Sequence, residues 1–255
     1  MRARRGIVGV ESAIVLIAFV IVAAALAFVV LNMGFFTSQQ SRLVIQRGLG
    51  EASSALELDG TVVAAVNVTA QRVIYLWTPI KLSAGQYKVD LSPSKTTVSY
   101  WSPDKSLTIT NAYLIAILTP ITNTSKLPDV INAILTQPVS GSKGAIVQLS
   151  VTVGSDTYTV YVGLPEDFSG TVDQLLAKYA SDKVIVVLNW VVRMNDDLVL
   201  DPGEKVVLFA YYKDASVRPD AYDLIKIEVK VPVGAPLTIE RMIPPSLTQP
   251  VAELG

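Results

Sequence analysis

The residues from Asn195 to Glu204 contain the densest group of carboxylate side chains in the sequence. The segment reads NDDLVLDPGE and carries one amide and four carboxylates within ten residues. Oxygen ligands are those that Ca²⁺ prefers, so the segment is a candidate calcium site that would stiffen a loop. Its ligands would be Asp197, Asp201 and Glu204, with Asn195 assisting. The alternative is a solvated hairpin turn built on Asx and Pro-Gly turn chemistry, because the spacing is not that of an EF-hand.

The composition excludes most other chemistry. The 255 residues include no histidine and no cysteine, and the formal net charge is −1. Without histidine there is no Ser-His-Asp triad and no His-ligated metal, and without cysteine there is no thiolate site or disulfide. A balanced charge gives no basic face for nucleic acid. We therefore expect a protein that is not an enzyme, has no nucleic-acid partner, and has no cofactor other than the possible structural Ca²⁺.

Two sequons are candidate sites of N-glycosylation. The first is Asn67-Val68-Thr69, and the second is Asn123-Thr124-Ser125. Asn123 lies between two prolines, which favours an exposed loop. Asn67 lies in a predicted strand and would have to face outward to be modified. Both predictions require that this part of the chain is exported.

The N-terminal segment is basic, then apolar over an unusual length. Arg4 and Arg5 belong to a basic cluster, and the 30 residues from Ser12 to Ser41 carry no formal charge. No proline precedes Pro79, so the sequence predicts one helix from about Ile7 to about Leu58. A bilayer core requires only about 20 residues, so this helix is longer than spanning needs.

Three interpretations of this segment compete. A secretory signal peptide would be cut after Ala27, so that the mature chain would start at Phe28. A plain membrane anchor would keep the segment, with the arginines holding the N-terminus on the cytoplasmic side. In the third interpretation the helix serves first as an anchor and then as the core of a helical assembly. Identical helices that associate through a rotation that does not close form an open filament.

The third interpretation rests on a specific resemblance. A short basic segment ends in Arg4-Arg5-Gly6, followed by Ile7-Val8-Gly9-Val10-Glu11 and the apolar run. This resembles the class III signal of archaeal flagellins (archaellins) and of the related type IV pilins. The resemblance implies cleavage between Gly6 and Ile7 by a prepilin-type peptidase. Glu11 then becomes the fifth residue of the mature chain, where type IV pilins carry a glutamate.

Glu11 has a physical role under this interpretation. A carboxylate in lipid or in a dry helical core costs several kcal/mol unless it is paired. Cleavage would create an α-amino group at Ile7, and the amine of a neighbouring subunit could pair with Glu11. The position near the helix start also favours negative charge through the helix dipole. The alternative is a glutamate at the level of the lipid headgroups with no special role.

From Gly60 onward the sequence predicts strands. The segment DLIKIEVKVPV alternates apolar Ile225, Ile227 and Val229 with charged residues, as a half-buried strand does. Six further segments share this texture: TVVAAVNVTA, SLTITNAYLIAIL, GAIVQLSVTVG, DTYTVYVGL, KVIVVLNWVVRM and EKVVLFAYYK. TVDQLLAKYA, which starts at Thr171, predicts a short helix. We expect the α+β class, with one long hydrophobic N-terminal helix followed by an antiparallel β-sandwich that is loosely immunoglobulin-like.

The expected division of the chain is a leader at residues 1–6, a helix at 7–59 and an outer β-domain at 60–255. Archaeal flagellins have this plan, and two further stretches are similar to the family, NDDLVLDPGEKVVL and TIERMIPPSL. The resemblance implies a structural subunit of a rotating extracellular motility filament. Its assembly contacts would include Glu11 and the aromatic residues Phe19, Phe28, Phe35 and Phe36.

The resemblance also implies partners and a location. The chain would assemble with copies of itself. It would meet the prepilin peptidase, an assembly ATPase with its membrane platform, and an oligosaccharyltransferase. The precursor would lie in the cell membrane with its N-terminus cytoplasmic. An adhesive pilin and a monomeric membrane-anchored surface domain remain the alternative functions.

Overall fold

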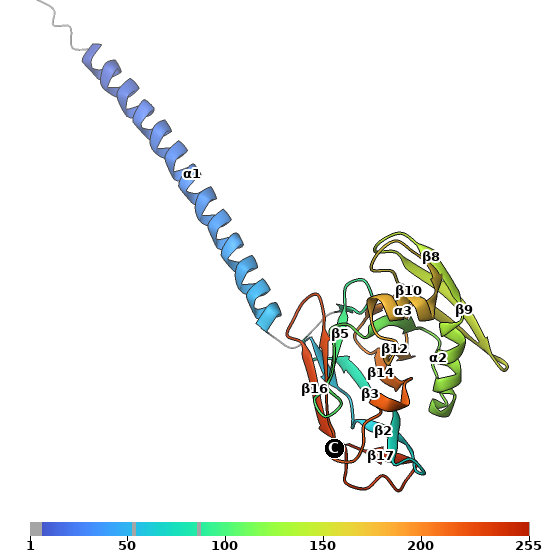
Figure 1. Cartoon of the computed structure of the whole chain (residues 1–255). Helices are drawn as coiled ribbons and strands as arrows, with labels where there is room; N and C mark the ends of the chain where they lie inside the picture. The colour runs from blue at the N-terminus through green and yellow to red at the C-terminus, as the bar shows by residue number, and fades with distance from the viewer. Residues whose placement is uncertain (1–6, 53–54, 86–87, 255) are drawn as a thin grey trace, which may run out of the picture. The chain divides into compact units, whose positions relative to one another are not determined.

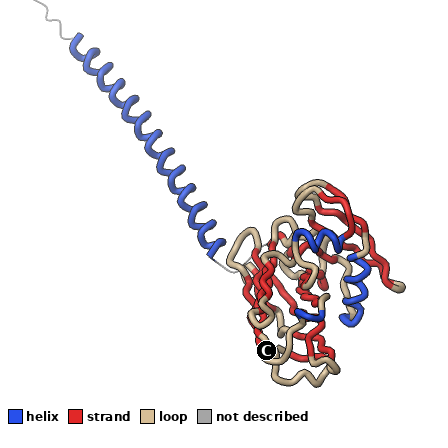
Figure 2. Tube along the Cα trace, in the orientation of Figure 1, coloured by secondary structure: helices blue, strands red, loops and turns tan. Residues whose placement is uncertain are grey.

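The structure is a computed structural model that describes residues 7–52, 55–85 and 88–254 (Figure 1). The chain divides into two compact units, Met1–Glu51 and Ala52–Gly255. The first contains one helix, and the second contains the strands and two short helices (Figure 2). We call the second unit the β-domain.

The first unit is the helix α1, Ile7–Ala52, which is 46 residues long. At 1.5 Å per residue this is about 70 Å. The helix runs through four glycines, at positions 9, 34, 48 and 50, each of which is less favourable in a helix interior than alanine by about 1 kcal/mol. Thr37, in the middle of the apolar run, satisfies its hydroxyl by donating to the carbonyl of Met33 at 2.8 Å.

The helix ends earlier than the sequence predicts. We expected helix to about Leu58 and a boundary at residue 59, but Leu56–Leu58 form the strand β1, which pairs with β3. Leu56, which follows Ile45, Leu49 and Ala52 in an apolar stripe at helical spacings of 4, 3 and 4 residues, is instead buried in the core of the β-domain. The stripe spacing was ambiguous because a single apolar residue fits both a helix face and a strand face.

Nine strands among the described residues form the main sheet of the β-domain. Their order is β17-β2-β3-β14-β12-β7-β10-β9, and β1 also pairs with β3. The strands are β1 Leu56–Leu58, β2 Val63–Asn67, β3 Arg72–Leu82, β7 Tyr113–Ile117, β9 Ile146–Val153, β10 Asp156–Gly163, β12 Val184–Val192, β14 Lys205–Tyr212 and β17 Val251–Glu253.

Pairing in this sheet is antiparallel except between β7 and β12, which run parallel. The prediction of an antiparallel sandwich therefore holds for most of the sheet and fails for this pair. The two strands are far apart in sequence, and the connection between them includes two helices. Such non-local pairing cannot be predicted from the alternation of apolar and polar residues within either strand.

A second sheet of four strands has the order β16-β15-β5-β6. Its strands are β5 Thr97–Ser102, β6 Leu107–Ile109, β15 Leu224–Lys230 and β16 Leu237–Met242. Tyr100 and Ile227 of this sheet share one hydrophobic core with Val186 and Leu188 of the main sheet. The two sheets thus pack face to face, as the predicted sandwich requires.

Helices cover the other face of the main sheet, which the sequence did not predict. Ile185 and Val187 of β12 share a second core with residues of α2, Leu127–Leu135, and α3, Val172–Tyr179. Because both faces of the main sheet are covered, β12 is buried at seven consecutive positions. The β-domain therefore has three layers, a small sheet, a large sheet and a pair of helices.

The helix predicted from Thr171 is confirmed as α3. Thr171 is its N-cap, and its hydroxyl accepts from the amide of Gln174, whose side chain accepts in turn from the amide of Thr171. This reciprocal capping box fixes the helix start. The helix α2 was missed because Pro128, at its first turn, reads as a breaker although proline is tolerated there.

The remaining elements are short. Two pairs of strands form separate ribbons, and two 3₁₀ turns lie in loops. They are β4 Val89–Asp90 with β13 Val199–Leu200, β8 Pro138–Gly141 with β11 Phe168–Thr171, η1 Thr124–Lys126 and η2 Ala215–Val217.

Candidate functional site

The surface of α1 is the largest candidate site in the described part of the chain. All of its residues from Gly9 to Gln46 are exposed, and the mean hydropathy of the most apolar 18-residue stretch within them is 3.4. By length and composition this helix is able to cross a membrane. An apolar surface of this extent does not remain in contact with water, so lipid or other apolar helices must cover it.

The aromatic residues predicted for assembly point in several directions from α1. At about 100° per residue, Phe28 lies about 180° around the helix from Phe19, and Phe35 lies close to the direction of Phe28. Phe36 lies about 100° further on. All four side chains are exposed, Phe19 to 77%. A helix with aromatic residues on all sides is suited to being surrounded, and not to packing through a single stripe.

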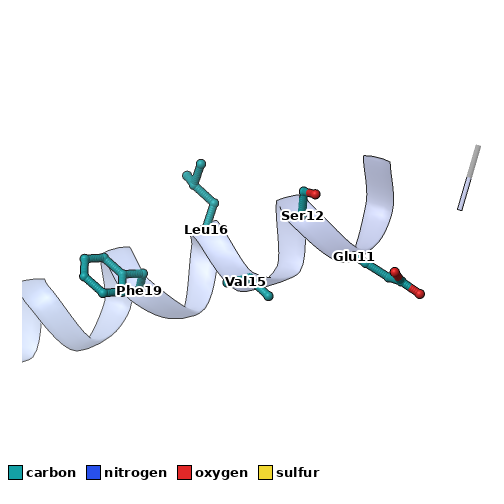
Figure 3. A pocket seen from close by; sticks show the side chains of 5 residues that line it. All are labelled: Glu11, Ser12, Val15, Leu16 and Phe19. Carbon is teal, nitrogen blue, oxygen red and sulfur yellow. The ribbon is translucent and has the colours of Figure 1, made fainter. Parts of the chain in front are cut away.

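A shallow hollow lies on α1 near its start. It is lined by Glu11, Ser12, Val15, Leu16 and Phe19 (Figure 3). Glu11, Val15 and Phe19 follow each other at four-residue spacing and form one ridge, and Ser12 and Leu16 form the next. Grooves between such ridges are where the side chains of a neighbouring helix insert.

A second hollow lies further along α1. Phe36, Thr37, Gln40, Ser41, Val44 and Ile45 line it. It again lies between two ridges of four-residue spacing, 36-40-44 and 37-41-45. The sequence predicted three residues of the two hollows, Glu11, Phe19 and Phe36, but not the hollows themselves. A helix that is apolar on all sides gives no indication of which of its faces a neighbouring helix contacts. The four-residue ridges themselves are the signal that could have found them.

Glu11 lies on the hollow near the helix start, but it is not in the first turn. The helix begins at Ile7, so Glu11 is its fifth residue, and the predicted benefit from the helix dipole is smaller than expected. Its carboxylate points toward the N-terminal end of α1 and away from Leu16 and Phe19 (Figure 3). This direction suits the expected pairing with an amine near Ile7.

The other predicted processing residues cannot be placed. Arg4, Arg5 and Gly6 lie outside the described residues, and Ile7 is the first residue of α1. The expected cut between Gly6 and Ile7 therefore lies at the border of the described residues.

The sequons lie at the surface of the β-domain. Asn123 is exposed, and its side-chain oxygen accepts from the amide of Ser125 at 3.0 Å and from its hydroxyl at 2.6 Å. Asn67 is half-buried at the last residue of β2, where it accepts from the amide of Ala70, and Thr69 is exposed. Asn67 therefore lies in a strand, as predicted, at the residue where β2 ends and the turn to β3 begins.

The side chains of the acidic segment form hydrogen bonds with the backbone of the segment and with each other. The two carboxylate oxygens of Glu204 accept from the amides of Met194, at 2.7 Å, and Asp201, at 3.0 Å. Asn195 donates to a carboxylate oxygen of Asp201 at 2.8 Å, and Asp197 accepts from the amide of Val199.

These contacts fit the turn interpretation of the segment. Glu204 is only 2% exposed and acts as a buried acceptor that closes the loop. Within the described ranges, no three Asp or Glu side chains come together closely enough to hold a metal ion. Calcium binding through Asn195, Asp197, Asp201 and Glu204 would require these side chains to rearrange, and it stays a prediction.

Comparison with known proteins decides the family. The family model of the archaeal-type flagellin matches residues 6–241. The chain belongs to the archaeal-type flagellin family. It is 40% identical to a "Probable flagellin 1" of Aeropyrum pernix, over 97% of this chain and 96% of that protein. It is 29% identical to a "Probable flagellin 2" of Archaeoglobus fulgidus, over 97% of this chain and 93% of that protein.

Two solved structures are also similar to this flagellin. The archaeal flagellum of Methanospirillum hungatei matches with a TM-score of 0.45 and 20% identity, over 96% of this chain and 98% of that chain. Flagellin FlaB1 of Methanocaldococcus jannaschii matches with a TM-score of 0.48 and 15% identity, over 79% and 97%. At these scores the structures add nothing to the assignment, which follows from the sequence relationship.

Membership of the family defines the broad role. An archaeal-type flagellin is a structural subunit of an extracellular filament made of copies of itself, and it is not an enzyme. The β-domain supplies the folded body of the subunit.

Proposed function

We propose that α1 forms the core of a rotating motility filament by packing against α1 of neighbouring copies, with the β-domains outside. The observation that carries this proposal is the surface of α1, which is exposed from Gly9 to Gln46 and apolar in all directions from residue 13 to residue 31. A helix of a monomeric soluble protein would bury such a surface within its own chain.

The same surface explains why the helix passes through a membrane first. Moving α1 from lipid into a bundle of like helices gains no hydrophobic free energy, so close packing through the two hollows must drive the transfer. Once the filament is outside, separating the helices exposes them to water at about 25 cal/mol per Å² of apolar surface. Assembly is therefore reversible at the membrane and in effect irreversible in water.

Glu11 is the proposed polar contact of the core. Cleavage after Gly6 by the prepilin-type peptidase leaves a free amine at Ile7, one helical turn from Glu11. Pairing with that amine, on the same or a neighbouring subunit, removes the cost of placing a lone carboxylate among apolar helices. The precursor lies with its N-terminus cytoplasmic, and the assembly ATPase and its membrane platform extract it.

The outer surface carries the proposed glycans at Asn67 and Asn123. Ser125 supplies the hydroxyl of the second sequon, and that hydroxyl already contacts the side-chain oxygen of Asn123. An oligosaccharyltransferase would modify both sites on the exported side. Asn123→Gln should remove one glycan mass from the peptide that contains it, while Asn132→Gln, which lies in no sequon, should leave the mass pattern unchanged.

Labelling of single cysteines tests the proposed core. The chain contains no cysteine, so Phe28→Cys and Ser142→Cys each create a unique thiol. In filaments sheared from cells and freed of lipid, Cys at position 28 should resist a water-soluble maleimide and react after detergent dissociates the filament. Cys at the exposed position 142 should react in both states.

Two outcomes would contradict the proposal. Rapid labelling at position 28 in sedimented filaments would place α1 outside the core. Failure to shear any material from cells, with the protein remaining in the membrane fraction, would favour a monomeric anchored domain. Loss of swimming in a deletion strain separates a motility filament from an adhesive one.

A further inference from the structure

Trp77 of β3 lies on the face of the main sheet that packs against the second core, but it stays half-exposed. The helix α2 on this face contacts β9, at the opposite end of the sheet from β2 and β3 (Figure 1). Val63 of β2, which pairs with Trp77, is half-exposed as well. The indole ring of Trp77 therefore keeps a part of its surface available to a further group.

The strand register fixes the position of Trp77 on this face. Three successive rows of side chains each join β3, β14 and β12. The rows are Pro79-Val207-Asn189, Trp77-Phe209-Val187 and Tyr75-Tyr211-Ile185. Successive rows on one face are two residues apart along each strand, which is about 7 Å. Trp77 thus lies in the middle row, between the row that contains Asn189 and the row that contains Tyr75.

The loop that carries the second sequon crosses this face from the first row to the third. The amide of Ile121 donates to the side-chain oxygen of Asn189 at 3.0 Å. Three residues later, the side chain of Thr124 forms a hydrogen bond with the phenol of Tyr75. The diagonal between these two contacts crosses the middle row, and Asn123 lies on this diagonal, directly before Thr124. The sequon is therefore held over the part of the sheet that contains Trp77.

Tyr75 connects the sequon to Trp77. The ring centroids of Tyr75 and Trp77 are 5.7 Å apart, and their planes are tilted by 36°. Tyr75 is buried and contacts Thr124, whereas Trp77, one ring further along β3, is half-exposed. The two rings thus form a continuous aromatic surface that begins at the sequon and ends at the solvent.

The side chain of Asn123 is fixed with its nitrogen free. Its Oδ1 accepts from both the amide and the hydroxyl of Ser125, which makes Asn123 the N-cap of η1. Within the described part of the chain, Nδ2 of Asn123 forms no hydrogen bond. An N-linked glycan is attached to this nitrogen, so the bond to its first sugar would leave from an atom that the loop already orients.

We propose that the exposed ring surface of Trp77 is the packing surface for the first sugar of the glycan on Asn123. This inference rests on the proposed function, because it requires the glycan that is proposed there. A pyranose presents C–H groups on one face, and the negative face of an aromatic ring attracts them. The stacked sugar covers the part of Trp77 that the protein leaves exposed, and it holds the glycan against the sheet.

The first sequon has a different surrounding and serves as a control. Asn67 pairs with Arg72, which precedes Trp77 by five residues on β3. At about 3.3 Å per residue the two positions are about 17 Å apart. A glycan on Asn67 therefore extends from the hairpin without its first sugar reaching Trp77.

Oxidation by hydroxyl radicals tests the proposal on full-length subunits that detergent has dissociated from sheared filaments. Ser125→Ala removes the second sequon and its glycan, whereas Ser125→Thr keeps both. Peptide masses should show that Trp77 is oxidised at least about three-fold more slowly in the wild-type and Ser125→Thr chains than in Ser125→Ala. Trp101, half-buried on the smaller sheet, should be oxidised at one rate in all three chains. Thr69→Ala, which removes the first sequon, should leave Trp77 protected.

A double-mutant cycle provides a second test. Loss of the glycan through Ser125→Ala should lower the Tm of the subunit by about 2–4 °C, the shift that one stacked contact gives in a domain of this size. In a Trp77→Leu background the same loss should change the Tm by less than about 1 °C, because the stacking surface is already absent. In a Trp101→Leu background the full shift should remain.

The outcomes separate this inference from the proposed function. A glycan mass on Asn123, with Trp77 oxidised equally fast in the wild-type and Ser125→Ala chains, would overturn the stacking and leave the proposed glycan intact. A peptide mass that shows Asn123 without a glycan would contradict the proposed glycan, and the inference would fall with it. The oxidation test leaves Trp77 in place, so it decides the question even if Trp77→Leu does not fold.

Discussion

Oδ1 of Asp59 lies 3.0 Å from Nζ of Lys81, and the other carboxylate oxygen of Asp59 contacts Lys205. Asp59 directly follows β1, Lys81 belongs to β3, and Lys205 begins β14. One carboxylate thus ties the first strand after α1 to two central strands of the main sheet. Hydrogen bonds from Lys205 and then from Lys81 lower the pKa of Asp59 below its usual value.

Asp59→Asn should therefore weaken the attachment of β1, and the size of the effect should depend on pH. Because the folded-state pKa of Asp59 is lowered, its stabilising contribution is present above the unfolded pKa of about 4 and is lost as the pH falls through the folded value. Thermal unfolding of detergent-dissociated subunits should show a lower Tm for the variant at pH 7. The difference should shrink toward zero below pH 3.

Asp196→Asn is the matched control for this measurement. Asp196 pairs with Arg193, but its side chain is 87% exposed, so the pair contributes little at any pH. A difference between Asp59→Asn and the unmodified protein that persisted unchanged at pH 2 would contradict the electrostatic origin.

The buried tyrosines predict a limit to stability at alkaline pH. Tyr100 donates to the hydroxyl of Tyr212 at 3.1 Å, and burial raises the pKa of Tyr100 to about 12. Burial also raises the pKa of Tyr212 and of Tyr113 well above the usual value. Their contribution is full below the unfolded pKa of about 10 and is lost as the pH rises through the folded values.

The free energy of unfolding should therefore be flat between pH 8 and 9.5 and should fall steeply above pH 10. Near-ultraviolet absorbance should show tyrosine ionisation together with unfolding and not before it. Tyr100→Phe should reduce the steepness of the fall, whereas Tyr222→Phe, which removes an exposed hydroxyl, should not change it. Ionisation of all tyrosines in the folded state would contradict the prediction.

The buried carboxylate of Glu204 makes a prediction that separates a turn from a calcium site. Glu204→Ala leaves the partly buried amides of Met194 and Asp201 without their acceptor, which should cost at most about 1–3 kcal/mol in total, because water can reach them. A chelator such as EDTA should leave the Tm of the unmodified protein unchanged. A fall in Tm on adding EDTA, reversed by Ca²⁺, would support calcium binding in place of the self-closed turn.

The hollow near the start of α1 predicts which residue matters most for filament stability. Phe19 lines the hollow, and Phe19→Ala would leave a cavity wherever a neighbouring helix packs, at a cost of about 3–5 kcal/mol per contact. Filaments of this variant should dissociate at a lower detergent concentration. Val233→Ala removes an exposed apolar side chain of the β-domain and should have no such effect.

The sequence predicts the elements that local physics specifies. α1 follows from an apolar run without proline, α3 from the capping box of Thr171 and Gln174, and β15 from strict alternation. These signals lie within a few residues of one another, so the chain around them does not alter the outcome.

The features that the sequence did not predict depend on residues far away in the chain. A proline such as Pro79 would normally exclude β3 from the middle of a sheet. Pro79 lies between the residues of β3 that pair with β1 and those that pair with β2. A Cβ on Gly60 would lie 3.2 Å from Cγ of Pro79, so glycine makes room for the ring. Likewise, the parallel pairing of β7 with β12 exists only once both strands are in place.

The candidate site also combines features that the sequence predicts with features that only the structure reveals. The long apolar helix can be predicted from composition, whereas its role in assembly and its assembly residues came from the resemblance to archaeal flagellins. The ridges that form the hollows require the helix phase that only the structure supplies.

Mass spectrometry of the N-terminal peptide from sheared, lipid-free filaments tests most directly whether the apolar helix is kept as the filament core. The mature chain should start at Ile7, with Glu11 as its fifth residue. A mature chain that starts at Phe28 would mean that most of the apolar segment is discarded on export. That result would contradict the proposed role of α1.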